Sequence, residues 1–287
     1  MKRNKLKYHC LLLGLLLFYL PLEAKPITDS VLIAGRRLTL RSEILGEERA
    51  VWVHLPDSYK EGSPSQEKYP VIYVLDADLN FLISIGVQAA LFRGGRSKAP
   101  NAILIGIENT DRTRDLTPTP AVSSKGQATL ANSGGGEKFT SFLARELIPM
   151  IEQRFRVNER CMLIGHSFGG LTVLNIFLKH TELFSDYLAI DPSLWWDNSK
   201  LLKEAERLIN QRKYPNVNIF IANAGKSKDR ALEREGILPL PKLFDKLKPS
   251  GLQWKYRRFE EENHGSVVLP SLFYGLRFLY QCNEKPD

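Results

Sequence analysis

One stretch of the sequence decides the fold: Cys161-Met162-Leu163-Ile164-Gly165-His166-Ser167-Phe168-Gly169-Gly170. It places Gly-x-Ser-x-Gly directly after an apolar run and directly before a helix-forming segment, residues 171–179. A serine at a sharp turn from strand to helix is held in a strained conformation, so Gly165 and Gly169 leave room that a Cβ atom would fill. We therefore predict that Ser167 is a nucleophile. The alternative is a structural turn, because short motifs of glycine and serine also arise by chance.

Apolar segments on both sides of this stretch predict the strands of a sheet. Two of them, residues 71–75 and 103–107, are continuous apolar runs. Continuous runs indicate strands that are buried on both faces, which is typical of a parallel sheet between two layers of helices. The eight expected strands are residues 32–40, 50–55, 71–75, 102–107, 162–164, 187–190, 217–222 and 254–259.

Helical patterns alternate with the strands after the second one. The expected helices are residues 81–93, 138–155, 171–179, 200–211, 238–247 and 270–281. We expect the second helix to kink or restart at Pro149, because proline cannot donate a backbone hydrogen bond inside a helix. This order of elements predicts an α/β fold of the α/β-hydrolase type: a single domain with a mostly parallel eight-stranded sheet flanked by helices. Ligands of such folds bind beyond the carboxyl ends of the strands.

The first residues of the chain have the pattern of a secretory signal peptide. Residues 1–7 carry four Lys or Arg side chains, an apolar run follows at 11–22, and small and polar residues surround Ala24. We predict a signal peptide at 1–24 and an exported domain, periplasmic or secreted, at 25–287. A membrane anchor is the alternative, but it needs about 20 apolar residues, and this run spans 12. Cys10 precedes the run, which argues against a lipid-modified cysteine.

The charge balance of the chain is mildly basic. The 287 residues have a formal charge of +8, and loss of residues 1–24 removes four basic side chains and one acidic side chain, which leaves +5. The basic residues are spread along the chain without a long block of Lys and Arg, so we expect no nucleic-acid partner. The residues after position 24 suit one large α/β domain.

Two cysteines remain after residue 24, Cys161 and Cys282. Cys161 begins the strand that leads to Ser167, and Cys282 ends the last predicted helix, which should return to the same edge of the sheet. The sequence leaves two arrangements open: a disulfide, which would require an oxidising compartment, or two separate thiols.

A serine hydroxyl needs a base to remove its proton, and histidine is the usual base because its ordinary pKa is about 6.5. Position in the predicted fold excludes four of the five histidines. His9 lies in the signal peptide, His54 within an early strand, His166 beside Ser167 but directed away from it, and His180 at the far end of the following helix. His264 follows the last strand, on a loop before the final helix, where an α/β hydrolase keeps its base. We predict His264 as the general base.

The acid that would orient His264 is less well determined by the sequence. In this fold it usually follows the seventh strand, and the first carboxylate there is Asp229. We predict Asp229 as the third catalytic residue. The alternatives are a Ser-His dyad without an acid, or one of four glutamates: Glu233, Glu235, Glu261 and Glu262.

Negative charge that develops on an ester carbonyl oxygen needs hydrogen-bond donors that are already in place. The backbone amide of Phe168, at a helix N-terminus directly after Ser167, is one predicted donor. The amide of Ala77, in the loop after the third strand, is the other. The flanking Asp76 and Asp78 fit equally well as turn and helix-capping residues.

Two further segments are expected at the active-site edge of the sheet. Segment 111–136 follows the fourth strand, is polar and lacks periodicity, so we expect an ordered loop over that edge; a solvated loop is the alternative. Trp195 and Trp196 follow the sixth strand and can form an apolar wall for the acyl or alcohol part of a substrate. The alternative is that one of them only packs the loop onto the core.

Several motifs, in this order, resemble the putative-esterase (esterase D-like) family of α/β hydrolases, which includes periplasmic and secreted siderophore esterases. They are Tyr73-Val74-Leu75-Asp76-Ala77-Asp78, the segment 106–118, the segment 165–170, Ser193-Leu194-Trp195-Trp196-Asp197-Asn198 and Asn263-His264-Gly265-Ser266. The resemblance covers most of the chain after residue 24. Several motifs in the right order are far more specific than any one of them.

The resemblance implies roles for individual residues. It implies Ser167 as nucleophile, His264 as base, and the amides of Ala77 and Phe168 as oxyanion donors. We take Arg114, from the segment 106–118, as a substrate contact beside Trp195 and Trp196. Relatives commonly have glycine where this chain has Ala77, and the segment around Asp229 lacks the Gly-Glu pattern that is common in the family.

These expectations give one main hypothesis and two alternatives. The main hypothesis is an exported serine esterase with a small-molecule ester substrate: Ser167 attacks the ester, His264 moves the proton, and water hydrolyses the acyl-enzyme. No metal or organic cofactor is expected. Siderophore-like or other small polar esters are the substrates implied by the resemblance alone. The alternatives are an acyltransferase that moves the acyl group to a sugar or lipid hydroxyl, and a non-catalytic binding protein of the same fold.

Overall fold

The computed structural model describes residues 34–62, 64–93, 100–122, 128–130, 132–225 and 239–282. Residues from Ala34 onward form one compact unit. The predicted signal peptide at 1–24 lies outside the described residues. In the part of the chain that is described, none of the helices combines the length and the apolar character needed to cross a bilayer.

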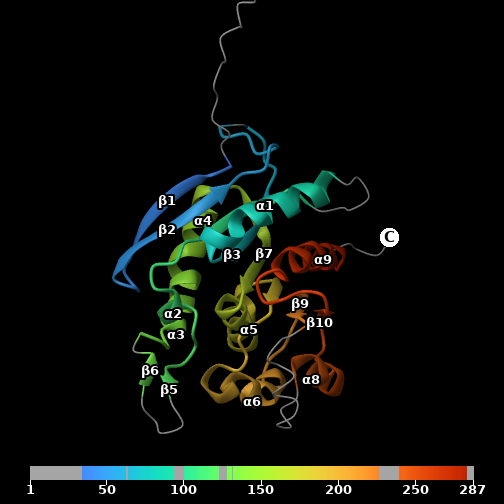
Figure 1. Cartoon of the computed structure of the whole chain (residues 1–287). Helices are drawn as coiled ribbons and strands as arrows, with labels where there is room; N and C mark the ends of the chain where they lie inside the picture. The colour runs from blue at the N-terminus through green and yellow to red at the C-terminus, as the bar shows by residue number, and fades with distance from the viewer. Residues whose placement is uncertain are drawn as a thin grey trace, which may run out of the picture. The chain divides into compact units, whose positions relative to one another are not determined.

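The described residues form an eight-stranded sheet with the order β1-β2-β4-β3-β7-β8-β9-β10 (Figure 1). The antiparallel pairs are β1 with β2 and β2 with β4, and all other neighbours are parallel. The strands are β1 (Arg36–Ser42), β2 (Glu47–His54), β3 (Tyr69–Leu75), β4 (Ile103–Ile107), β7 (Val157–His166), β8 (Asp186–Ile190), β9 (Val217–Ala224) and β10 (Leu252–Phe259). The mostly parallel eight-stranded sheet that the sequence predicts is therefore confirmed.

The two strands that read as continuous apolar runs, β3 and β4, lie inside this sheet with a strand on each side. Every residue of β4, β8 and β9 is buried. The edge strand β1 instead alternates between exposed and partly buried residues, because one of its faces meets water. The apolar pattern of each strand therefore reports how many of its faces are covered.

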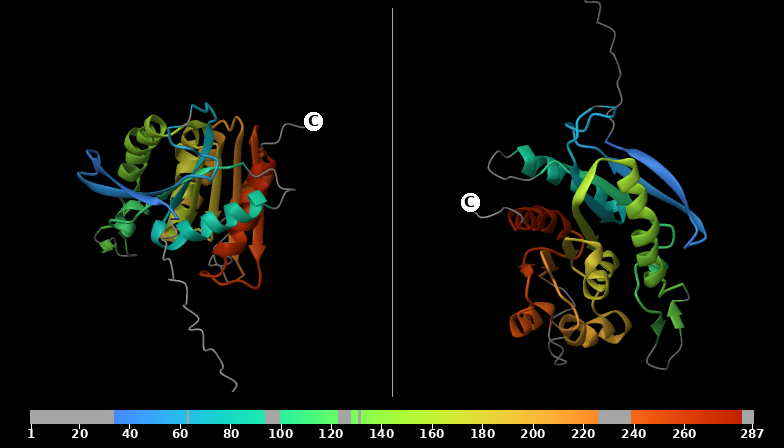
Figure 2. Two further views of the ribbon diagram at one scale, coloured as in Figure 1. Left: turned by 90° about the horizontal axis from the view of Figure 1, so that it is seen from above. Right: turned by 180° about the vertical axis from the view of Figure 1, so that it is seen from behind.

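Helices cover both faces of the sheet (Figures 1 and 2). The helices α1 (Ala77–Arg93) and α9 (Val268–Gln281) pack side by side and share one hydrophobic core with one face of the sheet. The opposite face shares a second core with the remaining long helices. These are α3 (Gly136–Phe142), α4 (Ile148–Arg154), α5 (Phe168–Lys179), α6 (Trp196–Asn210) and α8 (Leu240–Leu247).

The break expected at Pro149 is present. A π-helical turn, η1 (Leu143–Leu147), separates α3 from α4, and Pro149 lies in the first turn of α4. A proline has no N–H to donate to an earlier carbonyl, so the first turn of a helix is the place where it fits without loss of a hydrogen bond. The helical pattern at 138–155 is thus two helices joined by a wider turn.

The polar segment 111–136 contains more regular structure than its sequence predicts. It holds the short helix α2 (Arg112–Asp115) and a two-stranded antiparallel ribbon of β5 (Ala121–Val122) and β6 (Ala128–Leu130). Thr172 of α5 donates a hydrogen bond to the carbonyl of Leu116 at 3.0 Å. The described part of this segment is therefore ordered against the helix that follows Ser167.

Cys161 and Cys282 are both free thiols, so the structure contains the second of the two arrangements left open by the sequence. Both side chains are partly buried, and this burial raises the pKa of each thiol to about 11. Cys161 Sγ donates a hydrogen bond to the carbonyl of Leu183 at 3.2 Å. Two protonated thiols at neutral pH are poor nucleophiles.

Candidate active site

Ser167 occupies the sharp turn between β7 and α5. Its backbone has φ 60° and ψ −117°, a left-handed conformation that is strained for a residue with a side chain. A Cβ atom on Gly165 would come within 2.3 Å of the Gly169 carbonyl oxygen, so the turn closes only with glycine at that position. The strained turn therefore holds the Ser167 hydroxyl at the carboxyl end of a central strand.

A histidine and a carboxylate complete a hydrogen-bonded chain with this serine. His264, on the loop between β10 and α9, lies with Nε2 at 3.0 Å from Ser167 Oγ. Its other ring nitrogen, Nδ1, lies at 2.6 Å from Asp191 Oδ2. A carboxylate can only accept, so Nδ1 carries the hydrogen and Nε2 is left as the acceptor for the serine hydroxyl. This is the tautomer that a general base needs.

Asp191 corrects the acid predicted from the sequence. The single hydrogen on Nδ1 of His264 is bound by Asp191, whereas Asp229 was expected there. Asp229 lies outside the described residues, as do Glu233 and Glu235. The signal that was missed is position: Asp191 directly follows the buried strand β8, the immediate neighbour of the strand that leads to Ser167.

The environment of Asp191 keeps its carboxylate ionised. Burial pushes the pKa of Asp191 upward, but hydrogen bonds from His264, the Ala224 amide and the Asn223 side chain outweigh it and leave the pKa below its ordinary value. The Ala224 amide lies at 3.1 Å and Asn223 Nδ2 at 3.2 Å from Asp191 Oδ1. An ionised carboxylate at this position can stabilise a positive charge on His264.

Ser193 is a second hydroxyl beside the nucleophile. It is buried, and its Oγ lies 3.4 Å from Ser167 Oγ. Its backbone amide also donates to the carbonyl of Ser167 at 3.1 Å. The loop that follows Asp191 is thereby fixed against the turn that carries Ser167.

A second histidine, His166, supports the loop of His264. Its Nε2 lies 2.7 Å from the carbonyl oxygen of His264, so this nitrogen donates, and the two rings are 4.4 Å apart and tilted by 39°. Burial lowers the pKa of His166, and the neighbouring His264 lowers it further. His166 therefore holds the backbone of the residue that bonds to the Ser167 hydroxyl.

The two amides predicted as oxyanion donors begin helices at this edge. Ala77 is the first residue of α1 and Phe168 the first of α5, and the first amides of a helix have no acceptor within it. Asp76, which is buried and has φ 55°, accepts hydrogen bonds from Arg112 Nε and Nη2 at 2.7 and 2.9 Å. The Arg112 guanidinium also lies 5.3 Å from the centre of the Phe168 ring. One ion pair therefore links the loop of Ala77 to the turn of Phe168.

The structure separates the three residues predicted to contact substrate. Arg114 is bound to carboxylates through all three of its side-chain nitrogens, with Nε on Asp115 at 2.7 Å and the other two on Glu47 at 3.0 and 2.5 Å. A guanidinium held in this way stabilises the fold as an ion pair, and the contact of Arg114 with substrate stays a prediction. Trp196 is buried, and its Nε1 donates to the carbonyl of Thr119 at 2.9 Å, so it packs the loop onto the core.

Trp195 differs from its neighbour. It is 39% exposed, and its ring centre lies 6.2 Å from that of Phe168, the residue after the nucleophile. Three consecutive left-handed residues, 197–199, follow the pair at the start of α6. Of the two tryptophans, Trp195 is the one whose side chain is exposed.

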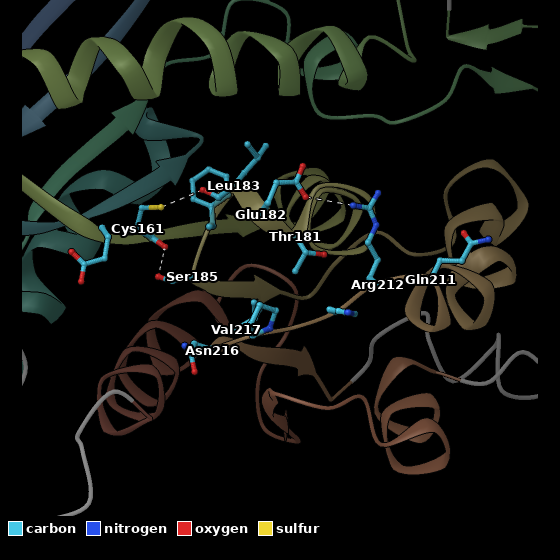
Figure 3. A pocket seen from close by; sticks show the side chains of 13 residues that line it. Cys161, Thr181, Glu182, Leu183, Ser185, Gln211, Arg212, Asn216 and Val217 are labelled. Carbon is cyan, nitrogen blue, oxygen red and sulfur yellow. Dashed lines mark hydrogen bonds and ion pairs between the residues drawn. The ribbon is translucent and has the colours of Figure 1, made fainter.

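A pocket of about 530 Å³ lies at the opposite edge of the sheet (Figure 3). Its lining includes Cys161 in the first half of β7, Ser185 directly before β8 and Val217 at the start of β9. Glu182 and Arg212 face each other across it, with 3.4 Å between Oε2 and Nη1. In a parallel sheet this edge is a full strand length away from Ser167, so the pocket is not part of the site around that serine. Among the described side chains, no cluster of His, Cys, Asp or Glu is arranged to hold a metal ion.

Comparison with known proteins agrees with this geometry. A model of the putative esterase family matches residues 42–264. The chain belongs to this family. The predicted family and the predicted enzyme class, an ester hydrolase, are thereby confirmed.

Relatives of this esterase carry more specific names. It is 29% identical to a ferri-bacillibactin esterase of Bacillus subtilis, over 78% of this chain and 83% of that protein. It is 28% identical to a siderophore enterobactin esterase of Emericella nidulans, over 77% of this chain and 85% of that protein. Among solved structures, an IroE-like serine hydrolase from Shewanella oneidensis has a TM-score of 0.77 and 32% identity, and the match covers 86% of this chain and 80% of that one.

Replacement of the acid tests the corrected assignment. Asp191→Asn keeps the shape of the side chain but removes the charge that orients His264, so we expect kcat for ester hydrolysis to fall by about a hundredfold or more. The matched control is Asp229→Asn, which we expect to change kcat less than twofold, measured in the same assay at pH 7 to 8. A large loss in Asp229→Asn with near-normal activity in Asp191→Asn would restore the original assignment.

His166 is tested by removal of its hydrogen-bond donor. His166→Phe keeps a ring against His264 but loses the N–H to its carbonyl, so we expect kcat to fall about fivefold, the equivalent of one hydrogen bond of about 1 kcal/mol, with KM little changed. His54→Phe is the control, because His54 also bonds to a carbonyl, that of Ala34 at 2.7 Å, but on an early strand. Equal effects of the two substitutions would show that the His166 contact does not position His264.

Proposed function

We propose that this chain is an exported serine esterase that hydrolyses carboxylic esters through an acyl-enzyme on Ser167. The observation that carries the proposal is the continuous chain of hydrogen bonds from Ser167 through His264 to Asp191, at 3.0 and 2.6 Å. A serine on a strained turn, a histidine in the correct tautomer and a buried carboxylate together form the arrangement that activates a serine hydroxyl.

In the acylation step, Ser167 Oγ attacks the ester carbonyl carbon as its proton moves to His264 Nε2. The imidazolium that forms is stabilised by the ionised carboxylate of Asp191. The carbonyl oxygen becomes negatively charged, and the amides of Ala77 and Phe168 donate to it at two helix N-termini. His264 then gives its proton to the leaving alcohol oxygen as the C–O bond breaks. Ser167 is left as an acyl ester.

In the deacylation step, water takes the place of the alcohol. His264 Nε2 removes one proton from the water as its oxygen attacks the acyl carbon. The second tetrahedral intermediate collapses as the bond to Ser167 Oγ breaks, and His264 returns the proton to that oxygen. The products are an alcohol and a carboxylic acid, and the free enzyme is regenerated. Every proton in this cycle is accounted for by the ester, the water and the Ser167–His264–Asp191 chain.

The substrate class in this proposal comes from the relatives. Two of them are named as siderophore esterases, of bacterial and fungal origin, and each aligns over more than three quarters of this chain. We therefore propose siderophore or siderophore-like esters as natural substrates of this protein.

Covalent labelling tests the nucleophile directly. We expect a fluorophosphonate to add a single adduct to the wild-type protein, and none to Ser167→Ala, which should also lose ester hydrolysis by about 10⁴-fold or more. Ser193→Ala is the matched control, because Ser193 Oγ lies only 3.4 Å away; that variant should still be labelled. Intact mass spectrometry reads out both results. An adduct on Ser167→Ala would mean that another residue is the nucleophile.

Export is tested by the mature N-terminus. We expect the protein, produced from the full sequence in a bacterium, to accumulate outside the cytoplasm with a mass that corresponds to loss of residues 1–24. The reason is the order of a basic start, a short apolar run and small residues. A control that replaces Leu15 and Leu16 with Asp should remain in the cytoplasm at full length. Full-length protein in the membrane fraction would favour the anchor over the signal peptide.

A further inference from the structure

Exposed apolar side chains gather around the proposed active site. In the described part of the chain, eight large hydrophobic side chains are exposed. Phe92 lies at the far end of α1 and Leu130 on the ribbon of β5 and β6, whereas the other six lie on segments that adjoin the residues of the proposed mechanism. We call these six the apolar rim: Leu79, Leu82, Ile83, Leu269, Phe273 and Trp195. Single exposed hydrophobic residues need no explanation, but a group of them at one site indicates a binding surface.

Five members of the apolar rim share one flank of the site. Leu79, Leu82 and Ile83 lie in the first two turns of α1, which begins at Ala77, and are 62%, 62% and 39% exposed. Leu269 and Phe273 lie in the first two turns of α9, just after His264, and are 57% and 37% exposed. Both helices begin at the carboxyl edge of the sheet, so all five are at the same end of the molecule as Ser167 (Figure 1).

The register of α1 and α9 brings these residues to nearly the same level. Farther along the two helices, Tyr280 of α9 donates a hydrogen bond to Gln88 of α1. Both helices follow parallel strands and return in the same direction, with a rise of about 1.5 Å per residue. Leu79 and Ile83 lie nine and five residues before Gln88, and Leu269 and Phe273 lie eleven and seven residues before Tyr280. The two pairs are therefore offset by two residues, or about 3 Å, along the helices.

The sixth member lies on the other flank. Trp195 follows Asp191 on the loop that leads to α6, a helix that packs against the opposite face of the sheet from α1 and α9. Its ring is close to that of Phe168, at the start of α5. Ser167, at the end of a central strand, therefore has exposed apolar groups on both sides.

We propose that the apolar rim binds aryl or alkyl parts of the ester substrate, so that the enzyme favours esters with bulky apolar groups over short-chain esters. This inference rests on the proposed function. A substrate fits better than a second copy of the chain, because a copy seated on both flanks would cover Ser167. It also gives a role to apolar side chains that stay exposed although other residues form the two cores.

A homologous series of esters tests the apolar rim. We expect wild-type kcat/KM to rise from 4-nitrophenyl acetate to the butyrate, octanoate and benzoate. In Leu79→Ser and Leu269→Ser, kcat/KM for the octanoate and benzoate should fall about fivefold each, as for partial burial of one leucine, and the acetate should change less than twofold. Phe92→Ser is the matched control, because Phe92 is 46% exposed at the far end of the same helix; it should leave the whole series unchanged.

Several results would overturn this proposal. Equal losses on acetate and octanoate would mean that the substitutions disturb the catalytic groups, and unchanged kinetics on all esters would mean that the rim does not touch substrate. A wild-type dimer in sedimentation velocity that becomes a monomer in the double serine variant would assign the surface to a second copy. Flotation of the wild type, but not of this variant, with phosphatidylglycerol vesicles would assign it to a membrane.

Labelling with fluorophosphonates separates this proposal from the proposed function. If the apolar rim binds substrate, a long-chain alkyl fluorophosphonate labels the wild type faster than an ethyl one. The double variant Leu79→Ser, Leu269→Ser then loses most of this difference in rate. Labelling of the wild type at equal rates with both reagents would overturn the proposal that the apolar rim binds substrate. The assignment of Ser167 as the nucleophile would stand. No labelling of Ser167 with either reagent would overturn the proposed function itself, and the rim proposal with it.

Discussion

The left-handed turn at Ser167 is the constraint on which the rest of the site depends. It requires a central strand buried on both faces before it, a helix after it, and glycine at position 165, where a Cβ atom would collide with the Gly169 backbone. A strained residue of this kind costs about 1 to 3 kcal/mol and persists only when its surroundings fix it. Here the Ser167 carbonyl accepts from the Ser193 amide, and its own amide donates to the Ile190 carbonyl at 3.0 Å. The end of the neighbouring strand β8 and the loop after it thus hold the turn in place.

Electrostatic pairs then fix the segments that meet at this turn. Asp191 is a buried charge, and such a charge is stable only with several hydrogen-bond partners. It has them from β9 as well as from His264, so the acid is positioned by the sheet and not by a flexible loop. Asp76 is a second buried carboxylate near the turn, and Arg112 is its ion-pair partner. This ion pair joins the loop of Ala77 to the turn of Phe168. Around these polar contacts, the apolar rim supplies the surface that a substrate needs beyond its ester group.

The sequence predicted most of the fold because its signals are local. Continuous apolar runs marked the buried strands, Pro149 marked the break between two helices, and the glycines around Ser167 marked the turn. His264 was identified by its place after the last strand. The acid was not, because an aspartate one strand away from the nucleophile and an aspartate two strands away look alike in sequence. The ion pairs of Arg114 could not be predicted for a similar reason: its partners, Glu47 and Asp115, include one that is 67 residues distant.

The sequence by itself therefore determined the sheet, its helical layers, the strained turn and the family, since each depends on residue order and on side-chain pattern over a few positions. Only the tertiary structure decided which carboxylate binds His264, and that His166 binds the backbone of the same residue. It also decided that Trp196 is buried while Trp195 is exposed. Finally, it brought together α1 and α9, which are joined by a hydrogen bond between residues 192 positions apart and form one apolar flank. The physical reason is that hydrogen bonds and ion pairs act over about 3 Å. Which groups come that close is fixed by strand order and helix register, and these are properties of the assembled chain.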